Sequence, residues 1–539
     1  MPTLEINNLG GPLTRKNNGD INSGLARFST SWGYDPYSKP GNLTWMEQPT
    51  SILSGSIAGV IVTMKQRSEG TDNNYVYAIS DNGIIRKITV NQPAGGLETA
   101  DSDSPSVIGS FAFAGNRTGG GALAFYGTPE KLYVSGDTTV AVSSFTGASS
   151  SIIGDSLTAF PRPFANFVGK LYFGNGNNIG EIDSTDTIVS TAKLSPALPV
   201  GLVVHDLDVT PSGNYLQLTT TKVNPLVVNG GSPDGITSNA TDSFKFYWNG
   251  VDGGVSAFDN YSGVVLLASI SQVDKDYTFS TDLTGMAVSV GKEKILSLPN
   301  TFVPKPNAVF SNGTLIGFGT NEYETSSGRF RGAIYNYGEF DKETPRGLYR
   351  LLRHNAQPYG DILNNDDVLA IPACINVSNR MYTPQRDAYP NNLVGTAKVY
   401  YSTTESSSVA GGANIAKLWR FRTAPTGVAS IVAGVYETQT QLFSKKVKIG
   451  EVRVYTEPLV GGNDFVVDLI GSGGSVISGG SQRFQVATGS VVTGTDMVQF
   501  NPAMAPTYAV GVRITNSSTT GVANWTGRKL EVDYEPAGK

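Results

Sequence analysis

The chain has 539 residues, of which 16% are charged and 10% aromatic, and its formal net charge at pH 7 is −5. A coiled-coil or long-helix protein would be richer in charged residues, and a disordered chain would hold fewer apolar residues than the 39% found here. A mildly acidic chain has no general attraction for nucleic acid or anionic lipid. The 63 glycines predict a folded protein with many tight turns.

Neither a membrane-spanning segment nor a secretory signal is expected. No window approaches the roughly 18 uninterrupted apolar residues of a membrane helix. The first residues lack a basic segment followed by an apolar stretch.

Short strands are predicted along nearly the whole chain. Segments rich in Val, Ile, Tyr, Phe and Thr alternate with clusters of Gly, Asn, Asp, Ser and Pro. The turn sequence Asp81–Gly83 contains an Asn-Gly pair, which tolerates the positive φ angles of a tight hairpin turn. Strands are expected at Tyr75–Ile79, Ile84–Ile88, Lys131–Val134, Lys170–Phe173, Ile179–Ile182 and Thr314–Phe318. The best helix candidate, Gly347–His354, is short, so we predict an all-β protein.

An internal repeat indicates a β-propeller. Pro161–Tyr172 and Pro304–Ile316 share two prolines, a basic residue, Ala, Phe, Gly and Leu when the second copy carries one extra residue. A weaker copy spans Ala122–Val134, about 40 residues before the first, which is close to the length of one propeller blade. Each copy reads as the inner hairpin of a four-stranded sheet.

These observations divide the chain into three parts. Residues 1–50 are an N-terminal strand or closure segment, and residues 51–425 form a β-propeller of about six to eight blades with a loop insertion at 221–243. A run of separate β-sandwiches is the alternative for this region. Residues 426–539 form an antiparallel, jelly-roll-like β-sandwich, because their strands are longer and alternate. These strands are Lys446–Tyr455, Asp464–Ile470, Tyr508–Ile514 and Lys529–Tyr534.

The histidines and the cysteine suggest no catalytic or metal site. His205 lies in an alternating strand pattern and is expected to face solvent or a partner, and His354 follows a basic stretch. The sequence has a single cysteine, which excludes a disulfide framework. This residue, Cys374, lies in an apolar run and is expected to be a small buried side chain. Neither a Gly-x-Ser-x-Gly nor a His-Glu-x-x-His segment is present.

Carboxylates and aromatic side chains are the other candidates for a site, because propellers host glycosidases. The acidic pairs Asp101/Asp103 and Asp366/Asp367 lie among Ser, Pro and Asn and are interpreted as solvated loops. Aromatic side chains could stack on sugar rings, but at alternating strand positions packing is the better interpretation. They are Phe244–Gly250, Tyr323, Tyr335 and Tyr337. We therefore predict no enzymatic activity, no catalytic, cofactor-binding or metal-binding residues and no cofactor.

Both ends of the chain resemble tail-associated virion proteins of bacteriophages. The segments that carry this resemblance are Ile6–Leu13, with its Gly-Gly-Pro-Leu, then Trp32–Asp35 and Lys39–Thr44. Near the other end, Lys446–Ile449 and Thr456–Gly462 are similar to the closing domains of those proteins. The resemblance implies a structural tail protein that is similar to the nozzle of short-tailed phages.

This resemblance also implies partners and a location. The chain is expected to form a closed homo-oligomeric ring, of six copies if it is nozzle-like, and to bind adaptor and fibre proteins of the virion tail. Genomic DNA would pass it without sequence recognition, and synthesis would take place in the host cytoplasm. The alternative function is a tail-fibre adaptor or a tail protein that binds a receptor or glycan.

Overall fold

The computed structural model describes the strands and their nearest connections, and every described element is a strand. Between 256 and 299 it describes the backbone alone. The described residues are 2–7, 9, 28–33, 35, 41–46, 49–52, 61–69, 73–80, 82–90, 104–110, 122–136, 139–143, 150–154, 157, 162–210, 212–222, 242–251, 255–262, 265–269, 276–282, 285–290, 293–299, 308–312, 315–324, 329–338, 347–353, 368–370, 374–377, 398–405, 415–422, 434–486, 491–518 and 525–537.

Small antiparallel sheets follow one another in sequence order, and we number them sheets 1 to 7. Sheet 1 holds β4 (Ile61–Glu69), β5 (Asn73–Ser80), β6 (Ile84–Val90) and β7 (Ser104–Ser110). Sheet 2 holds β8 (Ala122–Tyr126), β9 (Lys131–Ser135), β10 (Val140–Ser143) and β11 (Ser150–Gly154). Sheet 3 holds β12 (Phe164–Phe167), β13 (Lys170–Asn175), β14 (Asn178–Ile182) and β15 (Ile188–Ser190). Sheet 4 holds β16 (Leu202–Val209), β17 (Leu216–Lys222), β18 (Asp242–Trp248) and β19 (Ser256–Ser262).

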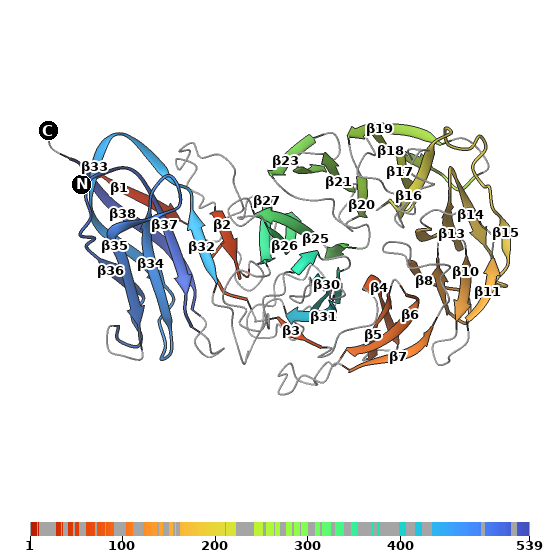
Figure 1. Cartoon of the computed structure of the whole chain (residues 1–539), viewed down its shortest axis with the longest axis horizontal. Helices are drawn as coiled ribbons and strands as arrows, with labels where there is room; N and C mark the ends of the chain where they lie inside the picture. The colour runs from red at the N-terminus through yellow and green to blue at the C-terminus, as the bar shows by residue number, and fades with distance from the viewer. Residues whose placement is uncertain are drawn as a thin grey trace. The chain divides into compact units, whose positions relative to one another are not determined.

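The remaining small sheets keep this pattern. Sheet 5 holds β20 (Val265–Ser269), β21 (Asp276–Asp282), β22 (Gly285–Val290) and β23 (Glu293–Pro299). Sheet 6 holds β24 (Val309–Asn312), β25 (Leu315–Glu324), β26 (Arg329–Gly338) and β27 (Gly347–Arg353). Sheet 7 holds β28 (Val368–Ala370), β29 (Cys374–Val377), β30 (Lys398–Glu405), β31 (Ile415–Arg422) and the early strand β3 (Thr50–Ser51). The arrangement is a β-propeller, as the repeat predicts, and not a run of sandwiches (Figure 1).

The short helix expected near Gly347–His354 is wrong. Gly347–Arg353 forms β27, the last strand of sheet 6, and His354 lies outside the described residues. Tyr349 is fully buried in this strand. Pairing with β26 therefore overrides the local helix preference of the Leu- and Arg-rich segment.

The two strong repeat copies form equivalent hairpins, but their alignment in sequence was wrong. Each copy supplies the first two strands of a sheet, β12 with β13 and β24 with β25. The strands meet at Phe167↔Lys170 in one hairpin and at Asn312↔Leu315 in the other. Phe167 is thus equivalent to Asn312, not to Phe310, because both hairpins close on two residues whereas the alignment matched the glycines.

Glycines let aromatic rings lie flat on these sheets. Phe173 faces Gly180 across sheet 3, and Phe310 faces Gly317 across sheet 6. A β-carbon on either glycine would clash with the ring of its partner. The glycine content therefore serves packing as well as turns.

The matched basic residue of the first copy is a buried structural group. Arg162 is fully buried, and its Nη1 donates to the carbonyl of Gly174 at 3.1 Å and to Oδ1 of Asn175 at 2.8 Å. Burial lowers the pKa of Arg162 to about 10. The guanidinium thus ties the entry of β12 to the far end of β13.

Sheet 7 closes against sheet 1 through a strand from the start of the chain. β3 pairs with β31 at Thr50↔Arg420 and Ser51↔Trp419, and the Ile52 amide donates to the Leu418 carbonyl at 3.0 Å. Leu418 is fully buried in a core made otherwise by side chains of β4, β5 and β6. This interlock joins Leu418 to residues of sheet 1 that lie more than 300 positions earlier in the chain.

Truncation of Leu418 tests this closure. Leu418→Ala should lower the free energy of unfolding by about 2–5 kcal/mol, because it opens a cavity between β31 and sheet 1. Val107→Ala, at an exposed position of β7, should cost less than about 0.5 kcal/mol. Equal effects in urea titrations would contradict the closure.

The chain divides into two compact units. One contains residues 50–333 and 364–420, and the other contains 1–49, 334–363 and 421–539, so the division passes through β26. The N-terminal strands β1 (Thr3–Asn7) and β2 (Phe28–Trp32) belong to the second unit, where β1 pairs with β38 and β2 with β32. Only β3, at the border of the expected closure segment, joins a propeller sheet.

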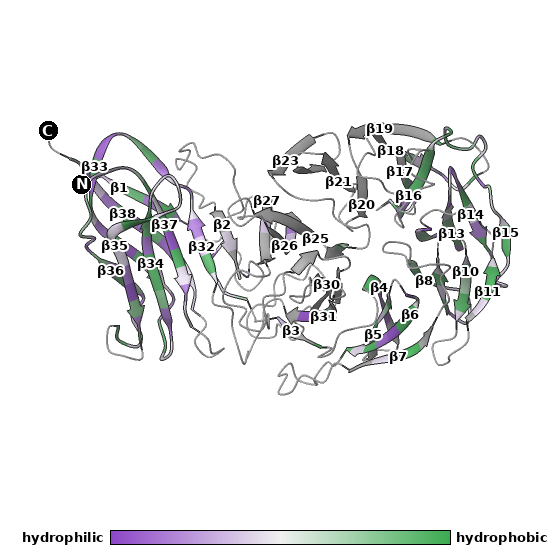
Figure 2. Ribbon diagram, viewed as in Figure 1, coloured by the Kyte–Doolittle hydropathy of each residue, from purple (hydrophilic) through white to green (hydrophobic). Residues whose placement is uncertain are grey.

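A large sheet fills most of the second unit, and we call it the terminal sheet. Besides β1 and β2 it contains β32 (Val435–Thr438), β33 (Gln441–Thr456), β34 (Asp464–Ile470), β35 (Val476–Gln485), β36 (Met497–Phe500), β37 (Thr507–Asn516) and β38 (Gly527–Pro536). Figure 2 shows hydrophobic and hydrophilic residues alternating along its strands. The expected long strands are confirmed, whereas the jelly-roll form stays a prediction.

One apolar core holds the terminal sheet together. Val454 of β33 and Val532 of β38 share this core with Phe465 of β34 and Ile514 of β37. The ring of Trp525 stacks on Phe465 with the centroids 4.2 Å apart. β33 and β37 each pair with several strands, so the strands form one connected sheet around this core.

A cross-strand network of charges covers the outer side of β1, β38 and β33. Glu531 accepts from Arg453 Nε at 2.9 Å and from Tyr455 at 3.0 Å, and it lies 2.6 Å from Lys529 Nζ. Lys529 also pairs with Glu5 of β1 at 3.2 Å. Hydrogen bonds from Lys529, and then from Arg453 and Tyr455, lower the pKa of Glu531 to about 2.

The network predicts an acid-sensitive terminal sheet. The folded-state pKa of Glu531 lies below its unfolded value, so its stabilisation is present above pH 4.5 and is lost as the pH falls toward 2. Glu531→Gln should destabilise the protein at pH 7 by about 1.5–3 kcal/mol and should flatten the stability profile between pH 4.5 and 2. Denaturant titrations across this range check both effects, and an unchanged profile would contradict the role of Glu531.

Candidate functional site

The structure buries His205, which the sequence analysis placed facing solvent or a partner. His205 is 2% exposed and lies at a bulge of β16, between Val204↔Thr220 and Asp206↔Thr219. A bulge breaks the alternation of a strand, so the pattern of apolar residues could not give the correct side. Cys374 begins β29, and its side chain lies outside the described residues.

Several other residues singled out in the sequence lie outside the described part of the chain. They are His354, Asp101, Asp103, Asp366 and Asp367, together with most of the insertion at 221–243. Only the backbones of Tyr323 and Tyr337 are described, whereas Tyr335 is buried. Among the described residues, no cluster of three His, Cys, Asp or Glu side chains could hold a metal ion.

The aromatic run in β18 packs inside the propeller. Trp248 lies 5.3 Å from Tyr172 and 6.3 Å from Phe167 between ring centroids, so it joins sheet 4 to sheet 3. Phe246 belongs to the same core. These two rings are therefore structural, which agrees with the packing interpretation.

The opposite face of sheet 4 carries a row of polar side chains. Asp206, Thr219 and Lys245 are cross-strand neighbours on β16, β17 and β18, and Thr219 and Lys245 are buried. β16 and β17 pack against β20 of sheet 5. Two of the three side chains in this row are therefore covered within the propeller.

Exposed apolar side chains gather instead on the hairpin turns of sheets 3 and 4. Val168 is 70% exposed in the β12–β13 turn, Val251 is 65% exposed after β18, and Tyr215 is 45% exposed before β17. Turns between first and second strands and between third and fourth strands lie at the same edge of such sheets. We call Val168, Tyr215 and Val251 the hairpin surface.

The two turns that carry the valines touch each other. A β-carbon on Gly250 would lie 3.0 Å from the ring of Phe167 and 3.6 Å from the side chain of Val168. Gly250 has a φ of +84°, which suits glycine. The indole nitrogen of Trp248 donates to the carbonyl of Val251 at 2.9 Å, which anchors the second turn.

Val168 has a backbone conformation that opposes its side chain. Its φ is +50°, in the left-handed region that β-branched residues rarely adopt. Val168 and Asp186 are the non-glycine residues of the described chain with positive φ. A strained, exposed valine in a two-residue turn gains nothing for folding, and strain of this kind gathers at functional positions.

Polar links from sheet 2 hold the strained turn in place. The hydroxyl of Tyr126 donates to the carbonyl of Gly169 at 2.9 Å, and Nδ2 of Asn166 donates to the carbonyl of Phe125 at 2.8 Å. Asp186 of the β14–β15 turn contacts Lys131 and Tyr133 of β9. The hairpin surface is thus preorganised, which reduces the entropy lost on binding.

The sequence analysis missed this surface. Its usable signal was Val168 before Gly169, at a position where a two-residue hairpin favours Asn, Asp or Gly. The valine looked like part of an apolar strand, and only the turn register shows that it lies beyond the strand end.

No protein-family model matches the chain, and no curated protein matches it. Solved structures that match include BBS1N in complex with ARL6DN, 9% identical, which covers 71% of this chain and 99% of that chain with a TM-score of 0.37. A subtype N11 neuraminidase-like protein (H18N11, flat-faced bat) is 11% identical over 71% and 99%, with a TM-score of 0.29. The GH74 enzyme of Niastella koreensis is 11% identical over 75% and 71%, with a TM-score of 0.33.

These likenesses are too weak to bear on what the chain does, because all three TM-scores are 0.37 or less. None of the three proteins is a phage tail protein. Among the described elements there is also no helix with the length and hydropathy needed to cross a membrane.

Relief of the strain at Val168 should stabilise the protein. Val168→Asn should raise the free energy of unfolding by about 1 kcal/mol, because Asn tolerates a positive φ. Val251→Asn is the matched control, since Val251 is similarly exposed but does not have a positive φ. If Val168→Asn leaves stability unchanged or lowers it in urea titrations, the backbone at Val168 is not strained.

Proposed function

We propose that the chain is a non-catalytic structural subunit of a bacteriophage tail, similar to a nozzle or hub, whose propeller is a rigid platform for other proteins. The exposed apolar side chains of the hairpin surface are the observation that supports a role in binding other proteins. The resemblance of both chain ends to tail-associated virion proteins supplies the assembly in which it acts.

The chemistry of the hairpin surface suits a protein partner. Two valines and one tyrosine, exposed on adjoining turns, offer apolar area with few polar groups to orient a small substrate. Exposed apolar patches of this kind mark protein contacts. Tyr215 lies 6.1 Å from Tyr247 between ring centroids, so its ring is supported at low entropic cost.

The propeller itself suits a platform role. Sheets 1 to 7 act in this proposal as seven blades, within the six to eight that the sequence predicts. Among the described side chains, shared apolar cores join sheet 7 to sheet 1, sheet 1 to sheet 2, sheet 2 to sheet 3 and sheet 3 to sheet 4. Such a body transmits force between partners with little internal movement.

The terminal sheet is proposed as the self-association element. Among the described strands, β1 and β35 each pair on one side only, so their other edges can take a strand from a second copy. β35 is ten residues long and exposes most of its side chains. Pairing of the β1 edge of one copy with the β35 edge of the next is a heterologous contact, and repetition of that contact closes into a ring, of six copies in the nozzle-like case.

A reconstruction of the virion tests this proposal. Copies of the chain should form a closed ring in the tail that contacts other tail proteins through the hairpin surface. Isolated copies that bind a glycan receptor, or a position outside the tail, would overturn the proposal in favour of a receptor-binding protein or a fibre adaptor.

A variant of the hairpin surface isolates its contribution. Val168→Asn with Val251→Asn should lower incorporation into particles at least tenfold while the purified chain stays folded. Val200→Asn, which replaces a fully exposed valine in the turn before β16, should incorporate normally. Equal incorporation of both variants, quantified by mass spectrometry of purified particles, would refute the role of this surface.

A further inference from the structure

The terminal sheet has an irregular corner where β33 separates from β37. Leu442 pairs with Ala509 and Val447 pairs with Thr507, so four residues of β33 lie opposite Tyr508 alone. β33 then pairs with β38 from Val447↔Pro536 onward. The extra residues leave the ladder and break the strand alternation.

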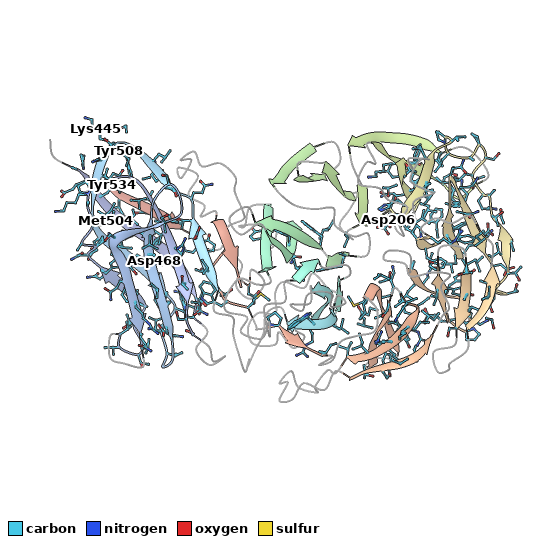
Figure 3. The ribbon with its side chains drawn as sticks, in the orientation of Figure 1. Asp206, Lys445, Asp468, Met504, Tyr508 and Tyr534 are labelled. Carbon is cyan, nitrogen blue, oxygen red and sulfur yellow. The ribbon has the colours of Figure 1, made fainter. Side chains whose placement is uncertain are left out.

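This irregularity exposes a cluster of lysines. Lys445, Lys446 and Lys448 are all exposed within four positions, whereas a regular strand would turn alternate side chains inward. Tyr508 is 55% exposed, and Nζ of Lys446 lies 5.6 Å from the centre of its ring. Figure 3 shows Lys445 and Tyr508 at the same end of the terminal sheet. We call these four residues the lysine corner.

The charge of the lysine corner is only partly balanced by a neighbouring carboxylate. A few residues along β33, Arg453 pairs with Glu451, Glu531 and Asp533. Among the described residues, by contrast, Lys445 and Lys448 form no ion pair, although Glu535 is the cross-strand neighbour of Lys448. The corner is therefore a local positive patch on a chain whose net charge is −5.

From this arrangement we propose that the lysine corner binds the phosphate backbone of duplex DNA without reading its sequence. Along a strand the three lysines span about 10 Å, at roughly 3.3 Å per residue. Over the same distance each strand of a duplex presents about three phosphates, one per 3.4 Å of helix axis. The number of charges and the length that they span are therefore comparable with those of three consecutive phosphates.

The chemistry of the side chains suits phosphate contact more than base contact. Lysine ammonium groups act as point charges on flexible stems, and the phenol of Tyr508 can donate a hydrogen bond to a phosphate oxygen. The corner offers no Arg or Asn fork that would read a base edge.

This proposal rests on the proposed function in one respect, because the tail role explains why the chain would encounter DNA. Binding of DNA by the isolated chain is a separate property, measured without virions. Loss of the virion role would leave a DNA-binding corner in place, and failure of DNA binding would leave the virion position untouched. A negative result in the virion reconstruction and a negative result in the DNA-binding measurement can therefore be told apart.

The test measures anisotropy of a fluorescent 30-base-pair duplex of mixed sequence with the full-length chain, from 20 to 200 mM NaCl. For three phosphate contacts, the slope of log K against log [salt] should be about −2.7. The triple variant Lys445→Gln, Lys446→Gln, Lys448→Gln should bind at least tenfold more weakly at 20 mM salt, with a slope near zero.

The matched control removes the same charge elsewhere. Lys65→Gln, Lys170→Gln and Arg528→Gln together replace three exposed cations, and this variant should keep the affinity and slope of the unmodified chain. Equal weakening by both triple variants would show a net-charge effect and overturn the proposal. An unchanged slope in the corner variant, or equally tight binding of polyglutamate by the unmodified chain, would also overturn it.

Discussion

The whole propeller depends on the fact that a four-stranded sheet cannot bury both of its faces by itself. Sheet 4 illustrates the constraint, because its apolar face needs Phe167 and Tyr172 of sheet 3 to cover Trp248. Each sheet in such a row needs the next sheet to bury its apolar face. The row is therefore stable only if the apolar face of its last sheet is also buried. The insertion of Leu418 into the core of sheet 1, with β3 paired beside it, supplies that last cover.

The same constraint decides where function can lie. In the sheets whose side chains the structure describes, the faces are used for packing, and this includes the polar row of sheet 4 that contains Lys245. Turns and sheet edges are what remains for partners. Both proposed surfaces lie there, one on the hairpin turns of sheets 3 and 4 and the other at the corner between β33 and β37.

Sequence reasoning succeeded where a physical rule acts over few residues. Asn82 and Gly83 predicted a turn, and Gly83 has a φ of +82° there. The alternation of Lys446–Tyr455 predicted one long strand, and β33 contains all of it. The repeat predicted equivalent hairpins, and each copy forms the first hairpin of its sheet.

It failed where register or distant pairing decides the outcome. Gly169 and Gly313 looked equivalent, but turn closure makes Gly169 equivalent to Thr314. His205 is turned inward by a bulge that leaves no mark on residue type. Neither proposed surface could be predicted from the sequence. Each consists of residues that do not pair with a neighbouring strand, and the register of that neighbouring strand decides which residues stay unpaired.

Positions that oppose local stability are therefore the most informative ones in this fold. Val168 has an unfavourable φ and an exposed apolar side chain, and the lysine corner concentrates like charges that repel one another. Around Glu531, by contrast, the charges are paired across strands. A side chain that destabilises the fold both through its φ angle and through its apolar exposure to water is best explained by a contact that buries it. That reasoning applies to Val168 on geometry alone, and it is why the partner contact is proposed on the turns of the propeller.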